Sequence, residues 1–273
     1  GQIMPGDVDR FRLQLTKGTK LVITAAARRL MPYLADAVPG WFQATLTLCD
    51  PDGREAAYAD DHRFDPDPVL YYEVPQDGAY VLEIKDAIFR GREDFVYRIT
   101  AGQLPCVTGV FPLGGPVDAP TPVTLTGWNL PSETITAGPY SQAPDIVPLS
   151  LGKHLCDSPV FSVDVLAECL EKEPNNQQDR AQQVSLPIIV NGRIEKPGDV
   201  DCFVFKAEEK QTLVIDVRAR RLDSPLDSLV VVLDEKGAEI ARSDDWEDPA
   251  AQMVTHHADS HLLHAFEKAG EYR

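Results

Sequence analysis

Apolar and polar residues alternate along much of this chain with the two-residue period that is typical of β-strands. In the stretch VDRFRLQL we expect Val8, Phe11 and Leu13 to point inward, with charged residues between them. No segment keeps a long 3.6-residue period, and even LLHAFEKAGEYR aligns with a strand-like segment. The pattern predicts an all-β fold, with strands and tight turns in the following stretches: 8–15, 21–30, 44–61, 69–86, 200–207, 213–222 and 262–273.

The chain contains the same pattern twice. Residues 5–30 and 197–222 match at a constant offset of 192, and 13 of their 26 positions are identical. The next matching block has an offset of 184, and the offset returns to 192 at Gly78 and Tyr80. Copy one therefore holds eight extra residues within 31–44, as loops do on a fixed scaffold. A match of this length indicates a duplicated folding unit.

Short strands at this spacing indicate antiparallel β-sandwiches. Between the repeats, the strands VTGVFP and VTLTGWNL flank a Gly/Pro turn and predict a small immunoglobulin-like β-domain. The stretch from Pro131 to Asp157 is rich in turn formers, and its strands cannot be assigned from the pattern. We therefore expect three domains: residues 1–104 (copy one), 105–167 (the immunoglobulin-like domain) and 168–273 (copy two).

The composition narrows the classes of partner. A hydrophobic fraction of 43% and a charged fraction of 25% in 273 residues suit globular domains with real cores. The net charge of −17 repels phosphate backbones and anionic lipids, so we expect neither nucleic acid nor membrane insertion. Such a surface attracts divalent cations and basic partners. No G-x-S-x-G, H-E-x-x-H or glycine-rich phosphate loop occurs, so we do not expect an enzyme.

Several motifs of copy two together resemble the bacterial pre-peptidase C-terminal domain. In order, they are EPNN, a Leu-Pro strand, NG-x-I, GD-x-D-x-F, and a D-x-x-G turn that leads to SDD, within residues 171–245. Copy one matches from NG-x-I onward but lacks the EPNN lead-in, and copy two stops before the last strand of copy one. Both ends are therefore expected to be cut from a longer protein. Residues 107–130 resemble an IPT/TIG-type immunoglobulin-like domain.

The resemblance implies jelly-roll-like β-sandwiches that accompany secreted bacterial enzymes, some binding collagen or polysaccharide and some binding calcium. Copy one keeps Asp7 and Asp9 of that pattern but has no lead-in to complete a site. Transferred by position, the calcium ligands of copy two would be Glu171, Glu173, Asn175, Asn176, Asp199 and Asp201.

The residues themselves fit this hypothesis, because Asp199 and Asp201 in a strand would face the same way, roughly 7 Å apart. Calcium takes six to eight oxygens, which carboxylates, Asn side chains and backbone carbonyls supply. The alternative is that Asp199 caps the turn that contains Gly198, while Asp201 is solvated. Two carboxylates also suggest the acid/base pair of a glycosidase. We do not expect one, because both copies carry these aspartates and a duplicated active site in two sandwiches is improbable.

Other chemistry-bearing residues have two interpretations each. Among the five cysteines, a Cys106–Cys156 disulfide and free thiols both remain open. Trp246 either pins a loop or offers a stacking platform. His256, His257, His261 and His264 are spaced like metal ligands, but the last two would lie on opposite faces of a strand. The basic pairs at 28–29 and 220–221 are expected to neutralise carboxylates or pack along the sheet, with an anionic ligand as the alternative.

We therefore expect a non-catalytic accessory or binding module of a larger secreted, periplasmic or cell-surface bacterial protein. It would present its sandwiches to a protein or polysaccharide partner, with calcium as the candidate cofactor. The alternative is a structural spacer between other domains.

Overall fold

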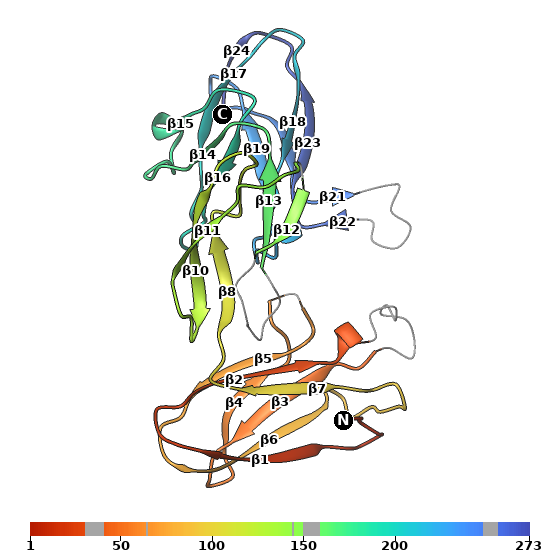
Figure 1. Cartoon of the computed structure of the whole chain (residues 1–273). Helices are drawn as coiled ribbons and strands as arrows, with labels where there is room; N and C mark the ends of the chain where they lie inside the picture. The colour runs from red at the N-terminus through yellow and green to blue at the C-terminus, as the bar shows by residue number, and fades with distance from the viewer. Residues whose placement is uncertain (31–40, 64, 144, 150–158, 248–255) are drawn as a thin grey trace. The chain divides into compact units, whose positions relative to one another are not determined.

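The computed structural model describes the whole chain except residues 31–40, 64, 144, 150–158 and 248–255. It confirms the all-β prediction, since strands make up the architecture and the helical segments are 3₁₀ turns of three residues (Figure 1). Within the described ranges, no helix has the length and apolar character that crossing a membrane requires. By its contacts the chain divides into two compact units, and each is described separately below.

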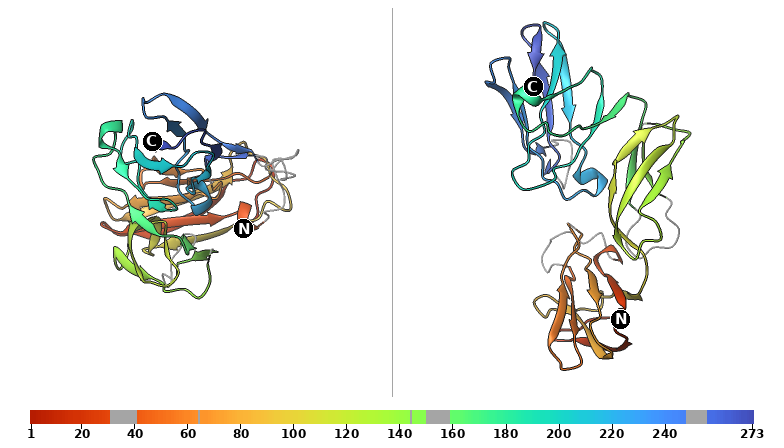
Figure 2. Two further views of the ribbon diagram at one scale, coloured as in Figure 1. Left: turned by 90° about the horizontal axis from the view of Figure 1, so that it is seen from above. Right: turned by 90° about the vertical axis from the view of Figure 1, so that its left-hand side faces the viewer.

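Copy one forms a two-layered sandwich (Figure 2). One sheet has the order β1-β6-β3-β4 and the other has the order β5-β2-β7. The strand bounds are β1 Asp9–Leu15, β2 Lys20–Ala26, β3 Ala44–Cys49, β4 Glu55–Ala59, β5 Val69–Glu73, β6 Gly78–Asp86 and β7 Arg98–Gly102. All the strand pairs in these two sheets are antiparallel.

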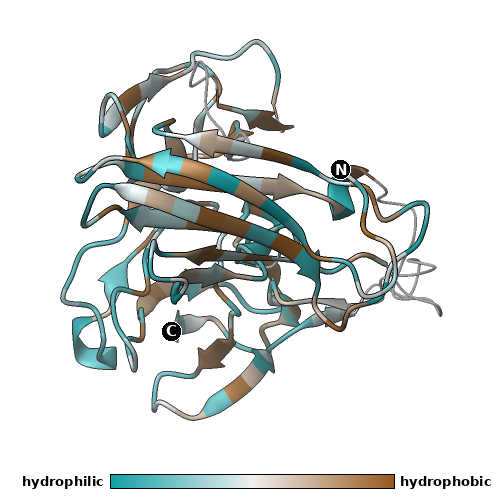
Figure 3. Cartoon of the chain, turned by 90° about the horizontal axis from the view of Figure 1, so that it is seen from below, coloured by the Kyte–Doolittle hydropathy of each residue, from teal (hydrophilic) through white to brown (hydrophobic). Residues whose placement is uncertain are grey.

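The sandwich of copy one closes over a continuous hydrophobic core. Along β6, buried residues occur at every second position, among them Tyr80, Leu82 and Ile84. Alternation of this kind places one face of each strand in the core, and it is visible as alternating colours along the ribbons in Figure 3. Ile23 from the opposite sheet belongs to the same core cluster, so the two sheets bury a common apolar layer.

Two local predictions for copy one need correction. Phe11 was expected to point inward, but it is 41% exposed because β1 is an edge strand of its sheet. The predicted strand 21–30 ends at Ala26, and a 3₁₀ turn, η1 (Arg28–Leu30), follows it. The reason for this turn is a buried carboxylate, described below.

The central segment contains more strands than its sequence indicated. The predicted strands appear as β8 (Cys106–Phe111) and β10 (Thr121–Trp128). The stretch without assignable strands holds β11 (Thr134–Ala137) and β12 (Asp145–Pro148). The remaining strands are β9 (Gly114–Pro116) and β13 (Val160–Asp164), which pair in parallel. Residues 126–133 belong to the compact unit of copy one, and most of the other central residues belong to that of copy two.

Copy two repeats strands β1 to β6 of copy one but in smaller sheets. The lead-in forms β14 (Glu168–Leu170), η2 (Gln178–Arg180) and β15 (Gln182–Gln183). The later elements are β16 Ile189–Asn191, β17 Phe203–Ala207, β18 Thr212–Asp216, η3 Arg220–Leu222, β19 Val230–Leu233, β20 Glu239–Ser243, β21 Trp246–Glu247, β22 His256–His257, β23 His261–Ala265 and β24 Gly270–Tyr272. The short pairs β14–β16 and β15–β17 are parallel, in contrast to the antiparallel arrangement expected.

The turns after β3 and β19 show how closely the two copies agree. In each, an aspartate begins the turn and its carbonyl accepts a hydrogen bond from the glycine three residues later, at 2.9 Å for Asp50 and 3.0 Å for Asp234. Gly53 and Gly237 have φ values of +80° and +79°, a conformation that favours glycine. The duplicated sequence therefore folds into a duplicated local geometry.

Candidate metal site

The lead-in of copy two lies against the loop that carries the GDVD motif. Carboxylate oxygens of Glu173, Asp199 and Asp201 all lie within 4.8 Å of one another. Glu173 comes from the lead-in, whereas both aspartates come from the loop before β17. Residues 26 and 28 positions apart therefore converge on one point, as the sequence predicted for three of the six proposed ligands.

Backbone amides hold these carboxylates in place. The Asn175 N–H donates to Glu173 Oε2 at 3.0 Å, and the Glu195 N–H donates to Asp199 Oδ2 at 2.8 Å. The other oxygen of Asp199 accepts a short hydrogen bond from the side chain of Asn176. Asn176 therefore binds Asp199 directly and acts as a support for the cluster.

Asn175 is the best-buried member of the predicted set, with no exposed surface. Its carbonyl accepts a hydrogen bond from the N–H of Cys202 at 3.0 Å, which ties the lead-in to the residue after Asp201. Both side-chain polar atoms of Asn175 are buried without a hydrogen-bond partner. Burying an amide without hydrogen-bond partners lowers the stability of the fold by about 1–3 kcal/mol. A cation beside the side-chain oxygen of Asn175 would supply the missing partner.

Glu171 and Asp201 complete the cluster. Glu171 Oε1 accepts the N–H of Arg193 at 2.7 Å, while Glu171 Oε2 and Asp201 Oδ1 are buried without a partner. Burial, followed by the charge of Glu171, raises the pKa of Asp201 to about 7. Four carboxylates crowded in this way repel one another, and a bound cation would remove that repulsion.

The donor set fits a hard cation such as calcium. Calcium prefers oxygen ligands, and the unpartnered atoms include oxygens of Asp201, Glu171 and Asn175. Gly192 leaves room beside them, since a Cβ there would lie 2.6 Å from Glu171 Oε2. In the described part of the chain, no other group of three acidic, His or Cys side chains converges closely enough to hold an ion.

The equivalent aspartates of copy one are satisfied by the protein itself. Asp9 Oδ2 accepts a short hydrogen bond from the hydroxyl of Tyr97, and Asp7 Oδ1 accepts the N–H of Val8 at 2.9 Å. Burial and the bond to Asp9 raise the pKa of Tyr97, so the tyrosine stays a donor. Identical residues in the two copies therefore have different partners.

The repeat also contains a pair of equivalent buried carboxylates, Asp67 and Asp259, which the sequence pattern alone did not single out. Asp67 is 1% exposed and accepts the N–H groups of Ala27, Arg28 and Arg29 at 2.6–3.1 Å. Its second oxygen also accepts Nε of Arg29 at 2.8 Å, so this carboxylate shapes η1. The signal was present, because Asp67 matches Asp259 at the same offset of 192.

Asp259 has the same contacts in copy two. It accepts the backbone N–H groups of residues 219–221 at 2.6–3.1 Å and Nε of Arg221 at 2.8 Å. Arg221 also pairs with Asp216 at 2.7 Å. The prediction that the basic pairs neutralise carboxylates is therefore confirmed for Arg29 and Arg221.

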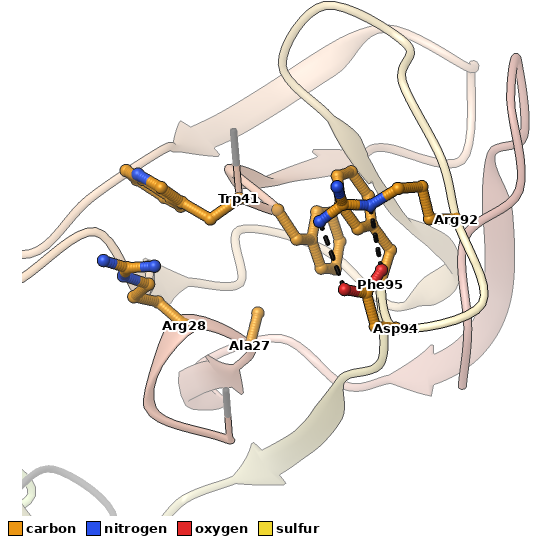
Figure 4. A pocket seen from close by; sticks show the side chains of 7 residues that line it. Ala27, Arg28, Trp41, Arg92, Asp94 and Phe95 are labelled. Atoms are coloured by element: carbon orange, nitrogen blue, oxygen red, sulfur yellow. Dashed lines mark hydrogen bonds and ion pairs between the residues drawn. The ribbon is translucent and has the colours of Figure 1, made fainter. Parts of the chain in front are cut away.

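Arg28, the other member of its pair, lines a pocket in copy one (Figure 4). Its guanidinium lies 4.7 Å from the ring centroid of Trp41, and its Nη1 is buried without a hydrogen-bond partner. Across the pocket, Arg92 forms a two-point ion pair with Asp94 at 2.9 and 3.1 Å. An anionic ligand, the alternative for this basic pair, would meet Arg28 in this pocket.

Among the described side chains, His261 and His264 belong to no group that could hold a metal ion. His261 stacks on Trp246 at 4.7 Å and contacts Asp216 through Nδ1 at 3.1 Å, whereas His264 lies edge-on to Phe266. His261 and His264 therefore have separate environments, as their spacing in a strand predicted. Trp246 packs on a neighbouring strand of the same unit.

The cysteines show both of the expected states. Cys106 is disulfide-bonded, whereas Cys49, Cys169 and Cys202 are free. Cys156, the predicted partner of Cys106, lies outside the described residues. Burial raises the pKa of the Cys169 and Cys202 thiols, which makes them weak nucleophiles.

The fold and the site define this chain as an all-β protein of repeated sandwich units, with an oxygen-rich acidic cluster in the second copy. No family model and no curated protein matches the chain.

Proposed function

We propose that the chain is a non-catalytic accessory module of a larger secreted or cell-surface bacterial protein. Its sandwiches would present binding surfaces to a protein or polysaccharide, and calcium would stabilise copy two. The observation that carries this proposal is the convergence of Glu173, Asp199 and Asp201 beside the buried, unpartnered side chain of Asn175. The resemblance to pre-peptidase C-terminal and IPT/TIG-type domains agrees with it.

A cation at this point would have a structural task. Glu173 belongs to the lead-in and the aspartates belong to the loop before β17, so one ion would join two segments far apart in sequence. Metal binding of this kind adds its free energy to folding. Calcium would thereby fix the lead-in on the sandwich of copy two.

Binding is tested by sedimentation with insoluble polymers, using collagen fibres, cellulose and chitin in calcium and in chelator. We expect the full chain to co-sediment with at least one polymer, more strongly in calcium. The Asp199→Ala plus Asp201→Ala variant should lose the calcium effect, whereas the matched Asp7→Ala plus Asp9→Ala variant should keep it. Absence of co-sedimentation under all conditions would favour the alternative of a structural spacer.

A further inference from the structure

The pocket of copy one lies between the turn that follows β2 and the segments before β3 and after β6 (Figure 4). Its lining comes from residues 27–28, from residues 41–42 and from the stretch 92–95. Its volume is about 230 Å³, part of which is open to solvent. Sites for drug-sized ligands have volumes of roughly 300–1,000 Å³, so this pocket suits a group of few atoms.

Three arginines in and around the pocket already have carboxylate partners. The ion pairs are Arg29 with Asp67 at 2.8 Å, Arg90 with Asp86 at 3.2 Å, and Arg92 with Asp94 at 2.9 Å. The positive charges of these three side chains are therefore compensated within copy one.

Arg28 differs from these three arginines. It forms no ion pair with any described residue, and its Nη1 is buried without a hydrogen-bond partner. The ring of Trp41, whose centroid lies 4.7 Å from the guanidinium carbon, holds the side chain by a cation–π contact. Such a contact contributes about 0.5–2 kcal/mol but leaves the charge of the guanidinium without a counter-ion. An anion that reaches the guanidinium from the pocket would supply one.

The other walls of the pocket are largely apolar. Phe42 and Phe95 are 5% and 2% exposed, and their rings stack with centroids 5.2 Å apart. Ala27 is buried beside them in the same core cluster. A ligand that fits has a charged group at Arg28 and a short apolar body against these side chains.

The balance of charge selects the kind of anion. One guanidinium without a counter-ion matches one negative charge, and the net charge of −17 opposes a dianion such as phosphate. A carboxylate carries a single charge and is planar, so it accepts two parallel N–H donors from a guanidinium.

We propose that the pocket of copy one binds the carboxylate of a small organic acid with a short apolar body. Arg28 binds the carboxylate, and Trp41 orients Arg28. The site belongs to copy one alone: Arg220 is the counterpart of Arg28 at the offset of 192, but residues 223–229 contain no tryptophan. This ligand goes beyond the proposed function and does not involve the metal site.

Trp41 offers a direct probe, because the chain has only three tryptophans. Their indole signals are followed by NMR in a chain with isotope-labelled tryptophan, while sodium propionate replaces sodium chloride at constant ionic strength. We expect the signal of Trp41, identified with a Trp41→Phe variant, to shift until it saturates. The signals of Trp128 and Trp246 should stay in place and report that the chain is folded.

Two substitutions should change the affinity for propionate in opposite directions. Arg28→Gln removes the cation and should weaken binding at least tenfold. Asp94→Asn removes the carboxylate opposite Arg92, which makes the pocket more positive, and should strengthen binding at least threefold. Arg220→Gln, the equivalent substitution in copy two, is the matched control and should leave the affinity unchanged.

The conservative variant Arg28→Lys separates charge from geometry. It keeps the cation but lacks the planar fork of donors, so we expect its affinity to lie between those of the wild-type chain and Arg28→Gln.

Three results would overturn the proposal: no saturable shift of Trp41, equal shifts of all three indole signals, or the same affinity in Arg28→Gln and Arg220→Gln. Tighter binding of inorganic phosphate or of galacturonate than of propionate would also contradict it, because the ligand would then be a dianion or an acidic sugar. Calcium and polymer binding are measured separately, so failure of the proposed function is distinguishable from failure of this inference.

Discussion

At the scale of single residues, one carboxylate per copy organises the end of the second strand. Asp259 is fully buried and accepts three backbone N–H groups together with Arg221. Burial alone would raise the pKa of its carboxyl, but the hydrogen bonds from Arg221 and the backbone outweigh it and hold the pKa below its ordinary value. Asp67 makes the corresponding bonds in copy one.

We expect Asp259→Asn to lower the free energy of unfolding by about 1–3 kcal/mol, because the amide nitrogen cannot accept these donors. Urea denaturation measures the loss, and Glu209→Gln, which removes an exposed ion pair with Lys210, is the control with almost no effect. Since the pKa of Asp259 is lowered in the folded chain, its stabilisation is fully present above the ordinary pKa and is lost as the pH falls from that value through the lowered one. An unchanged acid dependence in Asp259→Asn would contradict this role.

A second prediction concerns the space beside Glu171. Gly192→Ala places a Cβ 2.6 Å from Glu171 Oε2, so we expect calcium affinity to fall about tenfold, or about 1.4 kcal/mol. In Gly102→Ala the new Cβ has ordinary contacts of 3.6 Å, and affinity should be unchanged. Equal calcium-dependent thermal shifts for the two variants would show that Gly192 is not part of the site.

At the scale of elements, alternation and the repeat predicted the strands of both copies, because period and offset are local signals. They did not predict η1 and η3, since these turns depend on Asp67 and Asp259, about 40 residues away. For the candidate site, the structure brings the two aspartates and Glu173 together, whereas the pairing of Asp9 with Tyr97 needs a contact across 88 residues. Contacts of this kind depend on the tertiary structure, so a local sequence pattern does not predict them.

The two kinds of strand in one sheet of copy one predict a difference in local stability. Amides of Lys20–Ala26, in a strand with neighbours on both sides, should exchange with deuterium more slowly than those of Val69–Glu73, in an edge strand of the same sheet. Hydrogen exchange followed by mass spectrometry makes the comparison within one sample. Similar protection of the two strands would contradict the central position assigned to β2.

At the scale of the whole molecule, the two duplicated units differ in the size of their cores and in the partners of their equivalent aspartates. Copy one has the larger core, with two sheets closed over it, and its Asp9 is bonded to Tyr97. Among the described residues, copy two has a smaller core cluster and an acidic cluster. We therefore expect only copy two to bind a cation, although both copies contain the GDVD motif.

Calorimetric titration of calcium into the full chain tests this assignment most directly. We predict a single binding event in the wild-type chain, its loss in Asp199→Ala plus Asp201→Ala, and its retention in Asp7→Ala plus Asp9→Ala. Absence of heat in the wild-type chain, or an unchanged titration after the substitutions in copy two, would contradict the account.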